Sequence, residues 1–215
     1  MMKRTGWKAL LVLSAVCLMC MGGVIYAFLT HQAVLTNVFT VGNVSAELTE
    51  PSWSAEDGEG IFPGEEFDKD PTVTISSGSA DAVAFMEVTI PKKNVELINA
   101  SGGKEAAALT ELFRIGDLKT GWVELTGTGI GASSDTAVTR VYACTSVLTA
   151  GDAKTLFDTV TFANVAEGQI DSSEELKLTV TADLIQAGGM SIADPDAITS
   201  SELIDIYGKF KGQNS

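Results

Sequence analysis

Residues 175–186, with the sequence ELKLTVTADLIQ, contain the pattern that decides the fold. Every second position in this stretch is apolar: Leu176, Leu178, Val180, Ala182 and Leu184. The positions between them are mostly polar or charged. Because successive side chains of a β-strand point to opposite faces, this alternation predicts a strand with one buried face. Gly188 and Gly189 are expected to end it.

The same alternation occurs in residues 82–91, AVAFMEVTIP, and predicts a second half-buried strand. Shorter stretches rich in Val, Thr and aromatic residues lie between glycine- and proline-containing turns, at 34–44, 46–48, 71–77, 122–125, 137–147, 156–157 and 160–162. Many short strands with few helices indicate an all-β protein. We therefore expect an antiparallel β-sandwich of jelly-roll type.

Two stretches favour short helices. Residues 104–113, KEAAALTELF, are rich in helix formers and follow Gly102 and Gly103. In the tail, 194–210, Ser200 or Ser201 is a candidate N-cap before Leu203, Ile204 and Tyr207, which have helical spacing. We expect one helix in each stretch.

The N-terminus has the features of an export signal. Lys3, Arg4 and Lys8 precede an uncharged, mostly apolar run from Ala9 to Leu29, which predicts an N-terminal signal or transmembrane helix. Signal peptidase could cut between Ala27 and Phe28. The run is longer than an ordinary signal core and Ile25 is large for its position, so retention as a membrane anchor is the alternative. In either case the remainder is secreted or lies at the cell surface.

Charge and cysteine content narrow the classes of function. The chain has 14 basic and 28 acidic residues, a net charge of −14. Such an acidic surface repels nucleic acid, so we expect no nucleic-acid partner. Beyond the leader Cys144 is the only cysteine, which excludes an intrachain disulfide there. Its place in the strand-like stretch 137–147 predicts a small buried side chain.

The sequence offers no set of catalytic residues. His31 is the only histidine, so a zinc motif with two histidines is excluded, and no G-x-S-x-G, Walker or Rossmann pattern occurs. A Cys144–His31 pair is the remaining formal nucleophile arrangement. We predict that the protein is not an enzyme and has no cofactor.

Acidic loops leave one metal hypothesis open. Glu56, Asp57 and Glu59 form one cluster, and a second follows at Glu65, Glu66, Asp68 and Asp70. Neither has EF-hand spacing, so solvated loop charge is the main interpretation and loop-bound calcium the alternative. Trp53 and Phe62, which flank the first cluster, are expected to pack into the core rather than to form a ligand platform.

Three segments carry a resemblance to a known family. They are Ala27–Trp53, with A-F-L-T, T-N-V-F-T-V-G-N-V and L-T-E-P-S-W; Pro63–Thr74, P-G-E-E-F-D-K-D-P-T-V-T; and Leu156–Ala187, with L-F-D-T-V and L-K-L-T-V-T-A-D-L-I-Q-A. Together they resemble the TasA and camelysin (CalY) family of Gram-positive biofilm matrix proteins, which carry the SipW-dependent type of signal peptide. No motif matches in residues 92–140.

The resemblance implies a function for the N-terminal region. Residues 1–27 would be a signal peptide cut by a dedicated signal peptidase. Residues 28–40 would be a donor strand, and 41–215 a jelly-roll domain that polymerises into extracellular fibres by donor-strand complementation. The residues expected to form the strand are Phe28, Leu29, Thr30, His31, Gln32, Ala33, Val34 and Leu35.

Alternatives to this implied function remain open. The N-terminal segment could instead be an ordinary first strand of its own subunit. An accessory matrix protein is a further expected partner. Camelysin-like members are also labelled metalloproteases, but the zinc ligands are missing here, and a membrane-tethered adhesion module is the third hypothesis.

Overall fold

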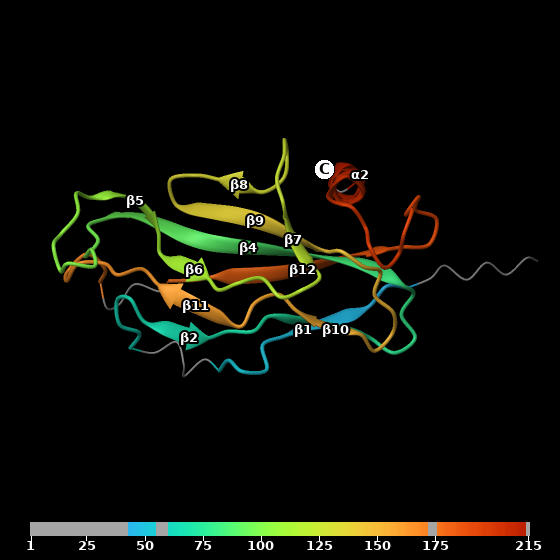
Figure 1. Ribbon diagram of the computed structural model, residues 1–215, viewed down its shortest axis with the longest axis horizontal. Coiled ribbons are helices and arrows are strands. Elements are labelled where there is room, and N and C mark those ends of the chain that lie inside the picture. The colour runs from blue at the N-terminus through green and yellow to red at the C-terminus, as the bar shows by residue number, and fades with distance from the viewer. Residues whose placement is uncertain (1–42, 55–59, 172–175, 214–215) are drawn as a thin grey trace, which may run out of the picture. The chain divides into compact units, whose positions relative to one another are not determined.

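Strand β4 (Ala82–Val95) lies at the centre of the largest sheet in the computed structural model, which describes residues 43–54, 60–171 and 176–213 (Figure 1). It pairs with β12 (Thr179–Gln186) on one side and β9 (Ala137–Cys144) on the other. The sheet has the order β12-β4-β9-β7, with β7 at Trp122–Leu125, and all its pairs are antiparallel. The two stretches with the clearest alternation are therefore hydrogen-bonded neighbours.

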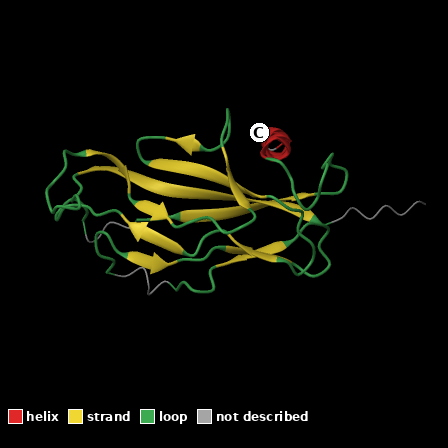
Figure 2. Cartoon of the chain, viewed as in Figure 1, coloured by secondary structure: helices red, strands yellow, loops and turns green. Residues whose placement is uncertain are grey.

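Two short strands extend this sheet. The distal half of β4 pairs with β5 (Ala108–Glu111), in the register Lys93 to Thr110. On the other side of β4, β8 (Ala132–Ser133) pairs with β9. Figure 2 shows the strands and loops that dominate the described chain, with one helix.

Two three-stranded antiparallel sheets complete the β structure. One has the order β1-β3-β10, from Ala46–Thr49, Thr72–Ile75 and Ala153–Thr155. The other has the order β2-β11-β6, from Glu66–Asp68, Thr159–Phe162 and Phe113–Ile115. Buried side chains from all three sheets meet in the larger core, among them Ile75, Met86 and Phe162. Figure 1 shows the two small sheets below the large one, and the side chains of the larger core fill the space between them.

The second face of β4 is also buried, which differs from the half-buried strand that its sequence predicts. Val83 and Phe85 are fully buried in a second cluster with Leu203 and Tyr207. These two come from helix α2 (Ser200–Gln213), which covers the outer face of the large sheet. Only Glu87 and Thr89 keep partial exposure in the predicted stretch before Pro91.

Helix α2 confirms the predicted C-terminal helix and corrects its N-cap. Thr199, not Ser200 or Ser201, caps it: Glu202 N–H donates to Thr199 Oγ1 at 3.3 Å, and Thr199 N–H donates to Glu202 Oε2 at 2.9 Å. These reciprocal bonds form a capping box. Lys211 in the last turn is favourable for the helix dipole.

The helix predicted over residues 104–113 is wrong, because the segment forms β5 and the start of β6. Ten residues are too few for a helix that is stable without tertiary contacts. Leu112 N–H instead donates to Pro91 O at 2.9 Å, and Leu112 and Phe113 are buried in the larger core. Pairing with β4 and burial of these two side chains outweigh the local helix propensity.

The antiparallel, mostly β character of the prediction is confirmed, with one helix in the described residues rather than two. Cys144 is fully buried, as expected. The predicted N-terminal helix, the cleavage site Ala27–Phe28 and the segment Phe28–Leu35 lie outside the described residues. No helix of the described ranges is long and apolar enough to cross a membrane.

Candidate functional site

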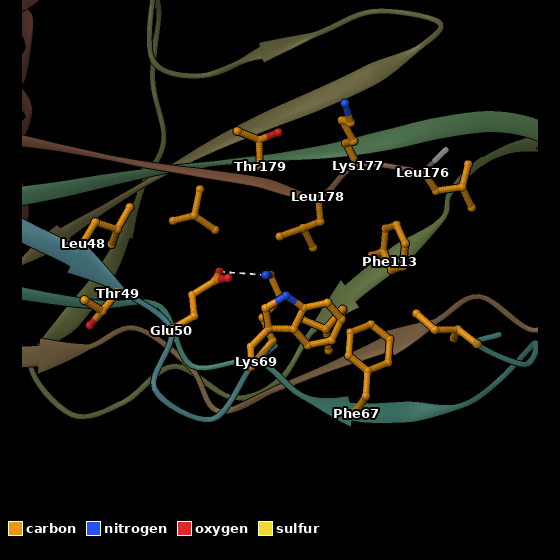
Figure 3. Close-up of a pocket in the computed structure, with 14 residues that line it drawn as sticks. Leu48, Thr49, Glu50, Phe67, Lys69, Phe113, Leu176, Lys177, Leu178 and Thr179 are labelled. Atoms are coloured by element: carbon orange, nitrogen blue, oxygen red, sulfur yellow. Dashed lines mark ion pairs between the residues drawn. The ribbon is translucent and has the colours of Figure 1, made fainter. Parts of the chain in front are cut away.

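A groove of about 750 Å³ opens beside β12 (Figure 3). Its walls come from three segments that are distant in the sequence, residues 48–53, 67–69 and 176–180, and from the single residues Ile61, Phe113 and Val160. Most of these side chains are apolar. Polar atoms nevertheless make up more of the exposed lining than apolar atoms, so the groove gives only partial access to the core.

The groove runs along three sheet edges. Leu48 and Thr49 belong to β1, Phe67 to β2, and Thr179 and Val180 to β12. Each of these strands has one hydrogen-bonded neighbour among the described strands, so each is the edge of its sheet. Edge strands present unpaired N–H and C=O groups that can accept a further strand.

The apolar residues along this edge are incompletely covered. Leu178 and Val180 pack against the larger core, yet both are only half-buried. On the neighbouring strand β4, Met86 and Val88 are fully buried. Leu48, across the groove, is 37 % exposed. The described residues thus leave the core partly open on the β12 side.

The opposite opening is closed by the chain itself. The segment between β6 and β7 runs across it, with Gly116 N–H donating to Thr159 O at 2.7 Å and Lys119 N–H donating to Leu156 O at 2.9 Å. A smaller hollow of about 490 Å³ remains there. The two sides of the core are therefore unequal: the chain bridges one side, whereas half-buried apolar side chains line the groove on the β12 side.

Paired polar groups line the smaller hollow. Arg140 donates to both carboxylate oxygens of Glu111, at 2.8 and 2.6 Å. Burial raises the pKa of Tyr142 beside them to about 12, and the charge of Glu124 adds to this effect. Because the guanidinium is already bound in a fork geometry, this hollow is a structural ion-pair site.

A buried ion pair lies on the wall of the larger groove. Lys69 is 7 % exposed, and its Nζ lies 2.7 Å from Glu50 Oε1 and 4.6 Å from the ring centroid of Trp53. The Trp53 ring in turn packs on Phe67 at 5.3 Å between centroids. A lysine is almost never buried without a partner, so the carboxylate and the aromatic face hold its charge there.

The two aromatic residues predicted to pack into the core have different outcomes. Trp53 does pack, on Phe67 and Lys69, and lines the groove. Phe62 is 73 % exposed, so its predicted packing is wrong. A turn explains this: Phe62 N–H donates to Glu65 Oε2 at 2.8 Å, and Glu65 N–H donates back to Phe62 O at 3.0 Å.

The second acidic cluster organises loops. Besides the Glu65 bond to the Phe62 turn, Asp70 Oδ1 accepts a 2.8 Å bond from Ser52 N–H, and Glu66 accepts one from Thr161 Oγ1. No group of three or more potential metal ligands gathers anywhere in the described ranges. The first cluster, Glu56, Asp57 and Glu59, lies outside them.

Of the remaining candidate pair, Cys144 and His31, the structure describes one member. Cys144 is fully buried with its Sγ 3.7 Å from Ser146 Oγ, whereas His31 lies outside the described residues. The residues that sequence reasoning missed are Glu50 and Lys69. In the sequence, Lys69 is the one lysine among the acidic residues of Glu65–Asp70. A charged residue in such a stretch is usually exposed, so the pattern did not predict that Lys69 is buried.

Comparison with protein-family models, with curated proteins and with solved structures finds no match for this chain. The fold and the groove themselves define a mostly β protein of antiparallel sheets, with a groove where the edge strands β1, β2 and β12 meet.

Proposed function

We propose that this chain is a secreted structural subunit of extracellular biofilm-matrix fibres. In this proposal the domain is a jelly-roll β-sandwich that lacks one strand at the β12 edge, and the N-terminal segment of another copy supplies that strand. The resemblance of three segments to the TasA and camelysin family motivates the assignment. Polymerisation by donor-strand complementation follows from the same resemblance.

The observation that supports the proposal most strongly is the groove between β12 on one side and β1 and β2 on the other. Three edge strands meet there over a half-covered core, while the opposite opening is covered by the chain. An inserted strand would gain main-chain hydrogen bonds and bury apolar side chains. Full burial of each large apolar side chain contributes about 1.5–3 kcal/mol, so a few such side chains supply substantial affinity.

The charge distribution favours the N-terminal segment as the occupant. From Ala9 to Ala46 the chain has no Asp, Glu, Lys or Arg, whereas the whole protein has a net charge of −14. Copies of such an acidic protein repel one another. An uncharged segment approaches the groove of another copy without adding to that repulsion.

Export and processing complete the proposal. Cleavage between Ala27 and Phe28 by signal peptidase would remove the leader and free the segment Phe28–Leu35. The mature protein would then reside in the extracellular matrix or at the cell surface. An accessory matrix protein with its own uncharged strand could occupy the same groove at a fibre end.

Two forms of the protein test this function, one beginning at Phe28 and one beginning at Val41. We expect the longer form to produce filaments in electron micrographs and the shorter form to remain monomeric in analytical ultracentrifugation. Circular dichroism on both checks that each is folded. Equal polymerisation by the two forms, or none by the longer form, would contradict the proposal.

A further inference from the structure

The Glu50–Lys69 pair lies midway along the groove. Figure 3 shows Leu48 and Thr49 on one side of it and Phe67, Phe113 and Leu176 on the other. The wall therefore presents the apolar Leu48 and the polar Thr49, then the charged pair, and then an apolar region. An extended strand that fills this groove requires a matching order of side chains on its inward face.

The charged pair has unused hydrogen-bonding capacity. The Lys69 ammonium has three N–H donors, and the described residues give it one acceptor, Glu50 Oε1 at 2.7 Å, and the face of Trp53. Glu50 is 28 % exposed through its side chain, so part of its carboxylate is open to solvent. A strand that covers the groove removes this solvent and must replace its hydrogen bonds.

An uncharged amide meets this requirement. Its NH₂ group donates to the Glu50 carboxylate, and its carbonyl oxygen accepts from the Lys69 ammonium. An apolar side chain would leave both charges without these bonds, and an acidic one would face Glu50 with like charge. The partner that fits is a neutral side chain with its donor and its acceptor on separate groups, as in an amide but not in a hydroxyl.

Within the expected strand Phe28–Leu35, Gln32 is the one amide side chain, and the next amide, Asn37, lies beyond that strand. On an extended strand Phe28, Thr30, Gln32 and Val34 share one face, so the amide lies between Thr30 and Val34, with Phe28 beyond Thr30. This order, two polar side chains between two apolar ones, matches the order of Leu48, Thr49, the charged pair and the apolar residues beyond it. A shift by one residue would exchange the faces, and a shift by two would place Thr30 or Val34 over the pair.

We propose that the buried Glu50–Lys69 pair fixes the register of the inserted strand by binding the amide of Gln32 from a second copy. The inference rests on the proposed function and adds to it a specificity-determining contact. Glu50 and Lys69 are positioning residues of the groove, and Gln32 is the side chain that they select.

A double-mutant cycle on the chain beginning at Phe28 tests this inference. The variants are Gln32→Leu, the groove variant Glu50→Gln/Lys69→Met, and their combination, with critical concentration for filament growth as the readout. We expect Gln32→Leu to raise the critical concentration about tenfold against the natural groove, the effect of losing hydrogen bonds to charged groups. Against the neutral groove the effect should fall within about twofold.

The matched control is Thr30→Val, which changes the same face two residues away. Its effect should be equal against the natural and the neutral groove. An equal effect of Gln32→Leu against both grooves would overturn the inference. Failure of the unaltered chain to polymerise would overturn the proposed function as well, so the two failures are distinguishable.

A second test changes only the inserted strand and leaves the groove unaltered. Its result therefore does not depend on whether the groove variant folds. Gln32→Glu is nearly isosteric with glutamine but brings a carboxylate to Glu50. We expect it to raise the critical concentration more than Gln32→Leu, and high salt to reduce that difference. Polymerisation of Gln32→Glu at the natural critical concentration would overturn the inference.

Discussion

The hydroxyl of Tyr207 on α2 donates a 2.6 Å hydrogen bond to Oε1 of Glu87 on β4. Lys211, one helical turn further on, forms an ion pair with the same carboxylate and lies 3.4 Å from Asp183 on β12. The Tyr207 ring also packs on Phe85 at 5.4 Å between centroids. These contacts fix the helix to the outer face of the large sheet, which makes β4 a strand buried on both faces.

This contact predicts an acid-sensitive helix docking. Burial raises the pKa of Glu87, but the hydrogen bonds from Lys211 and Tyr207 and the charge of Lys211 outweigh it, so the pKa is lowered below its usual 4.5. A lowered pKa in the folded state gives stability that is present above the unfolded pKa and lost as the pH falls through the folded pKa. We expect the melting temperature of Glu87→Gln to depend less on pH than that of the natural protein below pH 4.5. Parallel profiles would contradict this assignment.

Two substitutions at the start of α2 separate the observed N-cap from the predicted one. Thr199→Ala removes the side-chain bond to Glu202 N–H and should lower the free energy of unfolding by about 1 kcal/mol. Ser200→Ala, one residue later at an exposed position inside the helix, should change it by less than about 0.5 kcal/mol. Urea titrations measure both, and equal losses would contradict the capping box.

Much of this fold follows from local sequence pattern. The period-two alternation around residues 82–91 and 175–186 predicts two strands: the first lies within β4, and β12 covers the longer part of the second. The capping box was also visible, because Thr199 and Glu202 have the T-x-x-E spacing. These features were accessible since each depends on neighbours along the chain.

The remainder depends on contacts between distant segments. The helix propensity of residues 104–113 gave no sign of the pairing with β4, and Phe85 gave no sign of α2 above it. The groove could not be predicted from the sequence either, because Glu50, Lys69 and Leu178 come together only after the three sheets have formed. The type of a single apolar or charged residue does not indicate which distant segment of the chain will cover it.

Two glycines provide a test of the turn before β8. Gly131 has φ +68°, and an added Cβ would lie 2.4 Å from the backbone oxygen of Thr139. Gly129 has φ +77° but no atom near its Cβ position. Gly129→Ala should therefore cost about 1–2 kcal/mol from the left-handed backbone alone, and Gly131→Ala clearly more. Thermal unfolding compares them, and an equal cost would contradict the close approach to Thr139.

The buried ion pair of the groove predicts a stability difference between two lysines. Lys69→Met leaves Glu50 without its partner in a shielded site and should lower the free energy of unfolding by about 2 kcal/mol. Lys104→Met breaks the exposed Lys104–Glu96 pair and should change it by less than about 1 kcal/mol. Urea titration of the form beginning at Val41 measures both without interference from polymerisation. A loss at Lys69 no larger than at Lys104 would contradict the burial of the pair.

Photo-cross-linking tests directly whether the N-terminal segment of one copy enters the groove of another. A benzophenone side chain replaces Phe28 in ¹⁵N-labelled chains, which polymerise with unlabelled natural chains before irradiation. Mass spectrometry then identifies the cross-linked peptides. If the strand inserts into the groove, we expect cross-links from labelled position 28 to unlabelled peptides that contain residues 48–53, 67–69 or 176–180. Cross-links confined to the labelled chain itself, or to surfaces outside the groove, would contradict it.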